Sequence, residues 1–323
     1  MTSPVLSRMT DALPRTTTPL VRRLAIASLV SQIAIVVTGG AVRLTASGLG
    51  CPEWPRCTAD SIVTTPEMGF HGVIEFGNRL LTFVLVVIAV AMIVAVLGMR
   101  RERKDLFRLS LGLFAGIPVQ AVIGGITVWT DLNPWVVGLH FIASMVLVSL
   151  ATVLVNRSRL TTEQYREQQT QAAPPLLRQL LVTSTVLTSV AVVLGVVVTG
   201  SGPHAGDHGA ARNGLDSDLM TRLHALPVYL LVATVALAVV VAYRSQVHAK
   251  LRTALVLLAV VVLVQGLIGY TQHFLHLPVV LVALHMLGAS LLMAAAIHAL
   301  YTGTTHKPLP GIPVKIREPQ AVA

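Results

Sequence analysis

Two histidines lie at matching places of a repeated sequence, and histidine is a common metal ligand. The segment VQAVIG at 119–124, which leads to His140, recurs 145 residues later as VQGLIG at 264–269, which leads to His285. Both histidines lie in apolar sequence, where an ionisable side chain is costly unless it has a function. The repeat therefore predicts two related sites, each with an imidazole that binds a metal.

His224 is a second candidate ligand in the C-terminal half. His224 and His285 begin two apolar helices at similar depth, so both rings can point into one bundle and bind a metal from opposite faces. The alternative is a pair of core histidines hydrogen-bonded to backbone carbonyls. Two imidazoles without a nearby cysteine or carboxylate favour the iron of a haem b over zinc or non-haem iron.

The first half carries a different set of polar residues, because at an offset of 146 residues Asn78 takes the place of His224. His71, Glu75, Asn78 and Arg79 share about one helix face. A carboxylate inside a membrane helix is costly unless it is used. Glu75 is either the i,i+4 ion-pair partner of Arg79 or a catalytic carboxylate aimed at a ligand of His140.

Cys51 and Cys57 are the only cysteines, and they lie in one predicted outer loop. That location permits a disulfide, which would contribute about 2 kcal/mol by the chain-entropy model. The alternative is a redox-active pair that passes electrons to the adjacent site. The spacing alone does not separate these two roles.

The elements that must hold these residues are membrane helices. The 323-residue chain is 54% hydrophobic and 12% charged, with a mean hydropathy of +0.75, so the bilayer is its solvent. Eight apolar stretches are long enough to span a membrane, roughly 22–43, 73–98, 107–129, 135–155, 176–199, 219–243, 251–271 and 278–301. The predicted fold class is an all-α polytopic membrane protein with eight transmembrane helices.

The distribution of charge predicts the topology. The net charge is +10, and 19 of the 24 Lys and Arg residues fall in five segments: the N-terminus, 99–108, 156–178, 244–252 and the C-terminal tail. This asymmetry follows the positive-inside rule, so the basic excess does not indicate a nucleic-acid partner. It places both termini in the cytoplasm and the histidine sites toward the outer side of the membrane.

The two halves are predicted to run in the same direction, because an even number of spans precedes the polar linker. The repeat is then parallel, as two four-helix bundles related by an axis along the membrane normal. The expected organisation is an N-terminal four-helix half at 1–160, a cytoplasmic linker at 161–179 and a C-terminal four-helix half at 180–323.

The combination of these features resembles the haem A synthase family over nearly the whole chain. It is carried by the eight spans in two halves, the cysteine pair, the segment IEFGNR at 74–79, and the histidines at 140, 224 and 285. The resemblance implies oxidation of a methyl group of haem O to a formyl group, which gives haem A for cytochrome c oxidase.

The resemblance also implies roles for particular residues. The C-terminal half would hold a haem b cofactor through His224 and His285, and the N-terminal half would take the substrate haem, with Glu75 implicated in catalysis. Cys51 and Cys57 would form a disulfide. Further implied properties are a bacterial cell membrane location, haem O synthase as a partner, and an electron acceptor or quinone.

This chain departs from the family pattern at one position. The family usually has a histidine three residues after the glutamate, where this chain has Asn78. The iron of the substrate haem would then have His140 as its only ligand at a repeat position, with water or His71 on the other side. The residues expected around that haem are His140, Asn78, Arg79 and His71.

Two other classes of protein fit part of the pattern. A non-catalytic di-haem cytochrome b, carrying electrons between quinone and an outer acceptor, would need the same histidines but not Glu75. A transporter would explain the duplication but not the matched histidines. The haems that co-purify with the protein distinguish the three classes.

Overall fold

The structure is a computed structural model that describes residues 16–166 and 173–304. Every element in this part of the chain is helical, and eight helices are long and apolar enough to cross a membrane, which confirms the predicted fold class. The elements are α2 (Pro19–Leu44), η1 (Pro66–Met68), α3 (Gly69–Leu97), α4 (Lys104–Trp129), α5 (Pro134–Ser158), α6 (Thr162–Arg166), α7 (Pro175–Ser201), α8 (Ser217–Arg244), α9 (Ala249–Phe274) and α10 (Val279–Thr304).

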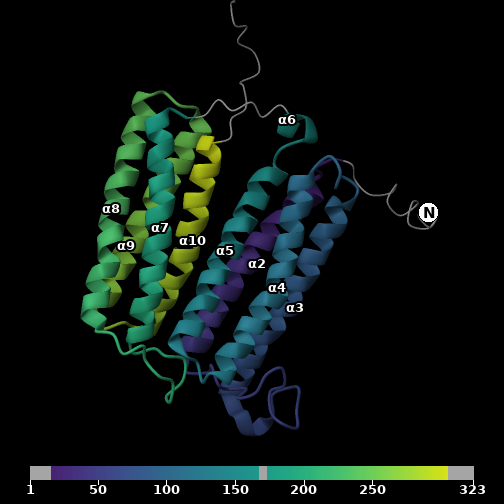
Figure 1. The fold of residues 1–323 in the computed structure, drawn as a ribbon, viewed down its shortest axis with the longest axis vertical. Coiled ribbons are helices and arrows are strands. Elements are labelled where there is room, and N and C mark those ends of the chain that lie inside the picture. The colour runs from purple at the N-terminus through teal and green to yellow at the C-terminus, as the bar shows by residue number, and fades with distance from the viewer. Residues whose placement is uncertain (1–15, 167–172, 305–323) are drawn as a thin grey trace, which may run out of the picture.

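The long helices form two bundles that lie side by side (Figure 1). In the first bundle α2 packs on α3 and α5, and α4 completes the ring between α3 and α5. In the second bundle α7 packs on α8 and α10, and α9 lies between α8 and α10. The two bundles meet where α10 contacts α2 and α5, and where α5 contacts α7.

Both bundles begin at the same end of the molecule. The hydroxyl of Thr17, just before α2, donates to the carbonyl of Leu160 at 3.0 Å, and the N–H of Ala173, just before α7, donates to the carbonyl of Gly303 at 3.1 Å. Each contact joins the start and the end of its own half, and Figure 1 shows both at the same end, so the equivalent helices run in parallel. We call the opposite end, which carries Cys51 and Cys57, the disulfide end.

Local sequence explains where the helices begin. Proline occupies the first position of α2, α5 and α7, where its missing N–H costs nothing. The side chains of Thr18, Asn133 and Asp216 accept hydrogen bonds from backbone N–H groups in the first turns of α2, α5 and α8. α7 begins at Pro175, inside the segment that the sequence assigned to the linker.

The apolar surface of the helices points mostly outward, as a lipid environment requires. Only 22–33% of the most apolar window of each long helix is buried inside the protein. Each bundle still has a packed core, with Leu177, Leu231 and Leu258 fully buried in the second half, and Met92 and Leu154 in the first. The candidate histidines lie nearer the disulfide end than these core residues, so the core does not depend on them.

Polar contacts tie the two halves together at both ends. At the disulfide end the guanidinium of Arg43 donates to the carbonyls of Thr199 at 2.9 Å and His204 at 2.6 Å. At the other end Nδ1 of His298 lies 2.7 Å from Oδ1 of Asn156. The two residues are 142 positions apart, so this contact depends on how the halves pack. The termini, 1–15 and 305–323, lie outside the described residues, so their cytoplasmic placement stays a prediction.

Candidate functional site

The rings of His224 and His285 face one another across the second bundle. His224 lies on α8 and His285 on α10, with ring centroids 6.5 Å apart and ring planes at 78°. A metal bonded to one nitrogen of each imidazole at about 2.0–2.1 Å places the two centroids roughly 6 to 6.5 Å apart. The spacing of the two rings therefore fits one metal ion bound between them.

The hydrogen bond of His224 leaves one ring nitrogen available. Nδ1 of His224 lies 2.9 Å from the carbonyl oxygen of Ala191. A carbonyl can only accept, so Nδ1 carries the proton and Nε2 keeps its lone pair. Metal-binding histidines are usually oriented in this way, by a carbonyl that accepts from the nitrogen that does not bind the metal. The core-histidine alternative fits His224 but not His285, whose Nδ1 is buried without a hydrogen-bond partner.

Glycines leave space for both rings. A Cβ at Gly195 of α7 would lie 3.2 Å from Cε1 of His224, and one at Gly269 of α9 would lie 3.2 Å from Cε1 of His285. Both distances are tighter than ordinary van der Waals contact. The two neighbouring helices can therefore approach the rings only because these positions lack a side chain.

The first half repeats this arrangement around His140. His140 is the seventh residue of α5 and His285 the seventh residue of α10, so both lie about 9 Å from the first residue of their helix. Gly124 of α4 takes the place of Gly269, and a Cβ at Gly124 would lie 3.4 Å from Cε1 of His140. Nδ1 of His140, like that of His285, is buried without a partner.

A glutamine in each half holds the backbone of its histidine. Nε2 of Gln120 donates to the carbonyl of His140 at 3.2 Å, and Nε2 of Gln265 donates to the carbonyl of His285 at 2.8 Å. The repeated VQ dipeptide was visible in the sequence, but no function could be assigned to it there. The glutamines fix the position of the two histidine backbones relative to α4 and α9.

The available metal-binding side chains favour a metal that is already held in a cofactor, which supplies most of its ligands. Among residues 16–166 and 173–304, no three or more His, Cys, Asp or Glu side chains gather as a possible metal site. Structural and catalytic zinc sites need three or four protein ligands, whereas haem iron needs only one or two axial ligands. A histidine pair, or one histidine, is therefore sufficient for a haem.

Glu75 forms the ion pair with Arg79 that the sequence left as one of two alternatives. Glu75 is buried, with a relative exposure of 6% for the residue, and its Oε1 accepts from Nη2 of Arg79 at 2.5 Å. Oε2 accepts from the backbone N–H of Cys51 at 2.6 Å. Glu75 therefore joins α3 to the loop at 45–65, which we call the disulfide loop. The catalytic role of Glu75 stays a prediction.

The disulfide loop is anchored to α3 by Arg79. Nη1 donates to the carbonyls of Glu53 at 3.0 Å and Arg56 at 2.9 Å, and Nη2 donates to the carbonyl of Cys51 at 3.0 Å. Cys51 and Cys57 are both buried and form a disulfide. The loop is thus closed by a disulfide and held to α3 through the guanidinium of Arg79 and the carboxylate of Glu75.

His71 and Asn78 already have polar partners. Nδ1 of the exposed His71 lies 2.9 Å from the hydroxyl of Ser47, so this hydrogen bond would have to break for Nδ1 to bind iron. Oδ1 of Asn78 accepts from the hydroxyl of Thr38 at 2.7 Å. Asn78 lies next to α2. A Cβ at Gly39 of α2 would be 3.9 Å from Nδ2 of Asn78.

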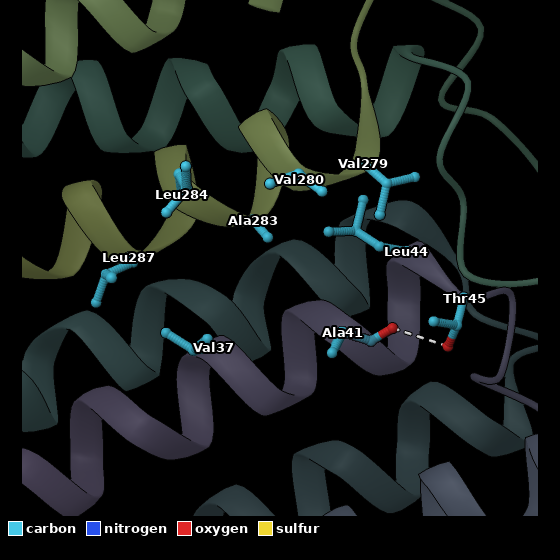
Figure 2. Close-up of a pocket in the computed structure, with 9 residues that line it drawn as sticks. All are labelled: Val37, Ala41, Leu44, Thr45, Val279, Val280, Ala283, Leu284 and Leu287. Atoms are coloured by element: carbon cyan, nitrogen blue, oxygen red, sulfur yellow. Dashed lines mark hydrogen bonds between the residues drawn. The ribbon is translucent and has the colours of Figure 1, made fainter.

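A groove of about 260 Å³ lies between the two halves and carries no titratable group (Figure 2). Its lining comes from α2, the residue that follows it and α10: Val37, Ala41, Leu44, Thr45, Val279, Val280, Ala283, Leu284 and Leu287. The hydroxyl of Thr45 is already bonded to the carbonyl of Ala41 at 2.9 Å. The groove is smaller than the roughly 300–1,000 Å³ of typical ligand sites, and nothing in it can perform chemistry.

The fold and the site define a class: a polytopic helical membrane protein with a duplicated four-helix bundle and histidines suited to bind haem iron. The chain belongs to the COX15-CtaA family of cytochrome oxidase assembly proteins, whose family model matches residues 22–206. The matched region is more than half of the chain and runs from within α2 to just beyond the end of α7.

Several relatives are heme A synthases. The chain is 29% identical over 170 residues to the heme A synthase of Exiguobacterium sibiricum, which covers 52% of this chain and 55% of the relative. It is 27% identical over 181 residues to that of Symbiobacterium thermophilum, covering 55% and 58%. The chain thus spans little more than half the length of these two relatives. A match to the heme A synthase of Shewanella oneidensis, at 24% identity, covers 85% of this chain and 94% of the relative.

Proposed function

We propose that this protein is a haem A synthase, which oxidises a methyl group of haem O to a formyl group and so supplies haem A for cytochrome c oxidase. The observation that carries the proposal is the 6.5 Å spacing of the His224 and His285 rings in a member of the COX15-CtaA family. That pair gives the family member a place for a haem that stays bound while the substrate haem is exchanged.

His224 and His285 are the residues that would hold the iron of a haem b. When bound there, haem b would supply one-electron transfer. The chain contributes the orientation of the ligands. Ala191 holds the ring of His224, Gln265 holds the backbone of His285, and the glycines at 195 and 269 leave room for both rings.

His140 is the proposed ligand of the substrate haem in the first half. With Asn78 in place of a second histidine, this half offers a single imidazole at the repeat positions. A substrate must be released as product, so weaker binding than in the second half suits the reaction. Asn78, Arg79 and His71 complete the proposed surroundings of the substrate.

Glu75 is the proposed catalytic carboxylate. Conversion of a methyl to a formyl group removes electrons and protons from the carbon and adds an oxygen atom. A buried carboxylate can accept such a proton, or stabilise positive charge that develops on the carbon, better than an exposed one can. Arg79 keeps the carboxylate in one place through two hydrogen bonds to Oε1.

The proposed setting is a bacterial cell membrane with the disulfide end toward the outside. Three things support it: the eight apolar helices, the bacterial relatives and the charge asymmetry of the loops. The proposed partners are haem O as substrate, haem O synthase as its source, and an electron acceptor or quinone in the bilayer.

Extraction of pigment from the purified protein tests the proposal. A haem A synthase should yield haem b together with haem O or haem A, whereas haem b alone would indicate an electron-carrying cytochrome. Replacement of His224 or His285 by alanine should abolish the bis-histidine spectrum while the protein still inserts, because insertion depends on hydrophobicity. His273→Ala, which changes an exposed histidine of α9, is the matched control. An unchanged low-spin spectrum in both site variants would refute the ligand assignment.

A further inference from the structure

The two halves differ in the contact that joins their second and third helices near the disulfide end. In the second half these helices are α8 and α9, and the hydroxyls of Tyr229 and Tyr270 lie 2.5 Å apart. This hydrogen bond joins the helices directly, side chain to side chain. This hydrogen bond would have to break for anything to pass between the two helices at this level.

The first half lacks both hydroxyls. At the offsets of 146 and 145 residues that relate the halves, Tyr229 corresponds to Phe83 of α3, and Tyr270 corresponds to Gly125 of α4. Phe83 is 67% exposed. The connection that fixes α8 to α9 is therefore not available between α3 and α4.

Gly125 has no side chain, and Trp54 of the disulfide loop fills the space where one would lie. A Cβ on Gly125 would lie only 2.8 Å from Cε2 of Trp54, so the indole ring rests directly on the backbone of α4. The indole N–H of Trp129 donates to the carbonyl of Trp54 at 3.2 Å, and the two rings meet edge to face at 5.3 Å. The loop is thereby attached to α4 at one side and, through Arg79, to α3 at the other.

The contact of Trp54 with α4 is one residue away from the contact of α4 with the candidate haem ligand. Gly125, on which the indole rests, follows Gly124, which packs against the ring of His140. The part of the loop around Trp54 can move without separating two helices, since its contacts with α4 are the packing of one indole and the hydrogen bond from Trp129 to the carbonyl of Trp54. The corresponding contact in the second half, the Tyr229–Tyr270 hydrogen bond, joins two helices and involves no loop.

We propose that the substrate haem enters and leaves the first half between α3 and α4, and that Trp54 closes this route as a lid. The proposal rests on the proposed function, because it needs an exchangeable haem beside His140. In the second half the Tyr229–Tyr270 hydrogen bond keeps the corresponding route between α8 and α9 closed, so haem b is retained. Trp54 is thus a positioning residue that controls exchange rather than a catalytic residue.

Haem release from the full-length protein in lipid nanodiscs tests this proposal. Excess apomyoglobin captures the released haem, and chromatography identifies each haem that has left. Trp54→Ala and Gly125→Ala should each release haem O or haem A about tenfold faster than the unmodified protein, because each removes the contact of the indole with α4. Release of haem b should not change. Tyr270→Phe should accelerate release of haem b alone.

Gly112→Ala is the matched control, since a Cβ at this position of α4 meets nothing within 4 Å. Hydrogen exchange of the backbone at 51–60 adds a measurement that needs no haem, and it should rise in Trp54→Ala and Gly125→Ala only. Release rates of haem O that stay within about twofold of the unmodified protein in both variants would overturn the lid. An equal increase in the release rates of haem b and haem O would also overturn the lid. A protein that never holds haem O or haem A would instead overturn the proposed function, and the lid with it.

Discussion

The backbone N–H of Cys51 donates a 2.6 Å hydrogen bond to Oε2 of Glu75. The carboxylate therefore has a structural role, since it holds the disulfide loop to α3 together with Arg79. Loss of the whole side chain would disturb the loop and any chemistry at once. A variant that keeps the acceptor but removes the charge separates the two roles.

Glu75→Gln should reduce haem A formation by about 10²-fold or more, as expected when a general base is lost. Haem O should accumulate, and the haem b spectrum should persist. The amide oxygen can still accept from Cys51, so the loop should stay in place, and Cys51 and Cys57 should resist thiol labelling without reductant. Glu67→Gln, at an exposed carboxylate of η1, is the control. A normal rate of haem A formation in Glu75→Gln would leave Glu75 with its structural role only.

Gly269→Val should weaken retention of haem b by about tenfold or more, in the range found when residues that orient a metal ligand are changed. The new side chain would push on the ring of His285, whose Cε1 is already only 3.2 Å from a Cβ at this position. The measurement is the haem b content of purified protein and its low-spin spectrum. Gly266→Val on the same helix faces open space and should change neither. Equal losses in both variants would point to damage to α9 rather than to the ligand.

The two glutamines should act separately, each on its own half. Gln265→Leu removes the hydrogen bond to the carbonyl of His285, and Gln120→Leu removes the one to His140. Each loss should cost about 1 kcal/mol. Gln265→Leu should therefore loosen haem b, and Gln120→Leu should loosen the substrate haem, as seen in the rates at which each haem dissociates. Each variant is the control for the other, and identical effects on both haems would contradict the independence of the two sites.

Much of the fold was predictable because membrane helices depend on local composition. The eight spans follow from runs of apolar residues, and the structure places a helix at each of them. The matched positions of His140 and His285 were likewise readable from a repeat at constant offset. Both signals are contained in the chain itself and do not depend on which helices are neighbours.

What the sequence could not provide are contacts between helices. Nothing in a run of apolar residues indicates that Gln120 reaches the carbonyl of His140, or that Gly195 packs on the ring of His224. The contact of Trp54 with Gly125 joins residues 71 positions apart, so no local pattern indicates it. Such partners depend on helix packing, which a hydropathy pattern does not determine.

Reporter fusions test the orientation predicted from the loop charges. Fusions in the 99–108 loop should report the cytoplasm, and fusions at 45–65 or 202–216 should report the outside. The reason is that Lys and Arg concentrate in the loops at the end opposite to the disulfide. The reverse pattern would place Cys51 and Cys57, with the histidine sites, on the cytoplasmic side.

Asn78→His should convert the substrate site into a second bis-histidine site. Asn78 corresponds to His224, and the nearby Gly39 leaves space, because even a Cβ there would be 3.9 Å from the amide nitrogen. The variant gives up the hydrogen bond from Thr38 but adds a second imidazole at a repeat position of this half. The substrate haem should then dissociate about tenfold more slowly, and its spectrum should become low-spin.

Asn78→Leu separates the gain of a ligand from the loss of the hydrogen bond to Thr38. It removes the same bond and adds no donor, so it should hold the substrate haem no more tightly than the unmodified protein. Absorption and electron paramagnetic resonance spectra of protein that contains both haems give the spin state. If Asn78→His binds both haems and the spectrum of the substrate haem is unchanged, the iron does not lie within reach of position 78. The substrate site would then have to be sought on another face of α3.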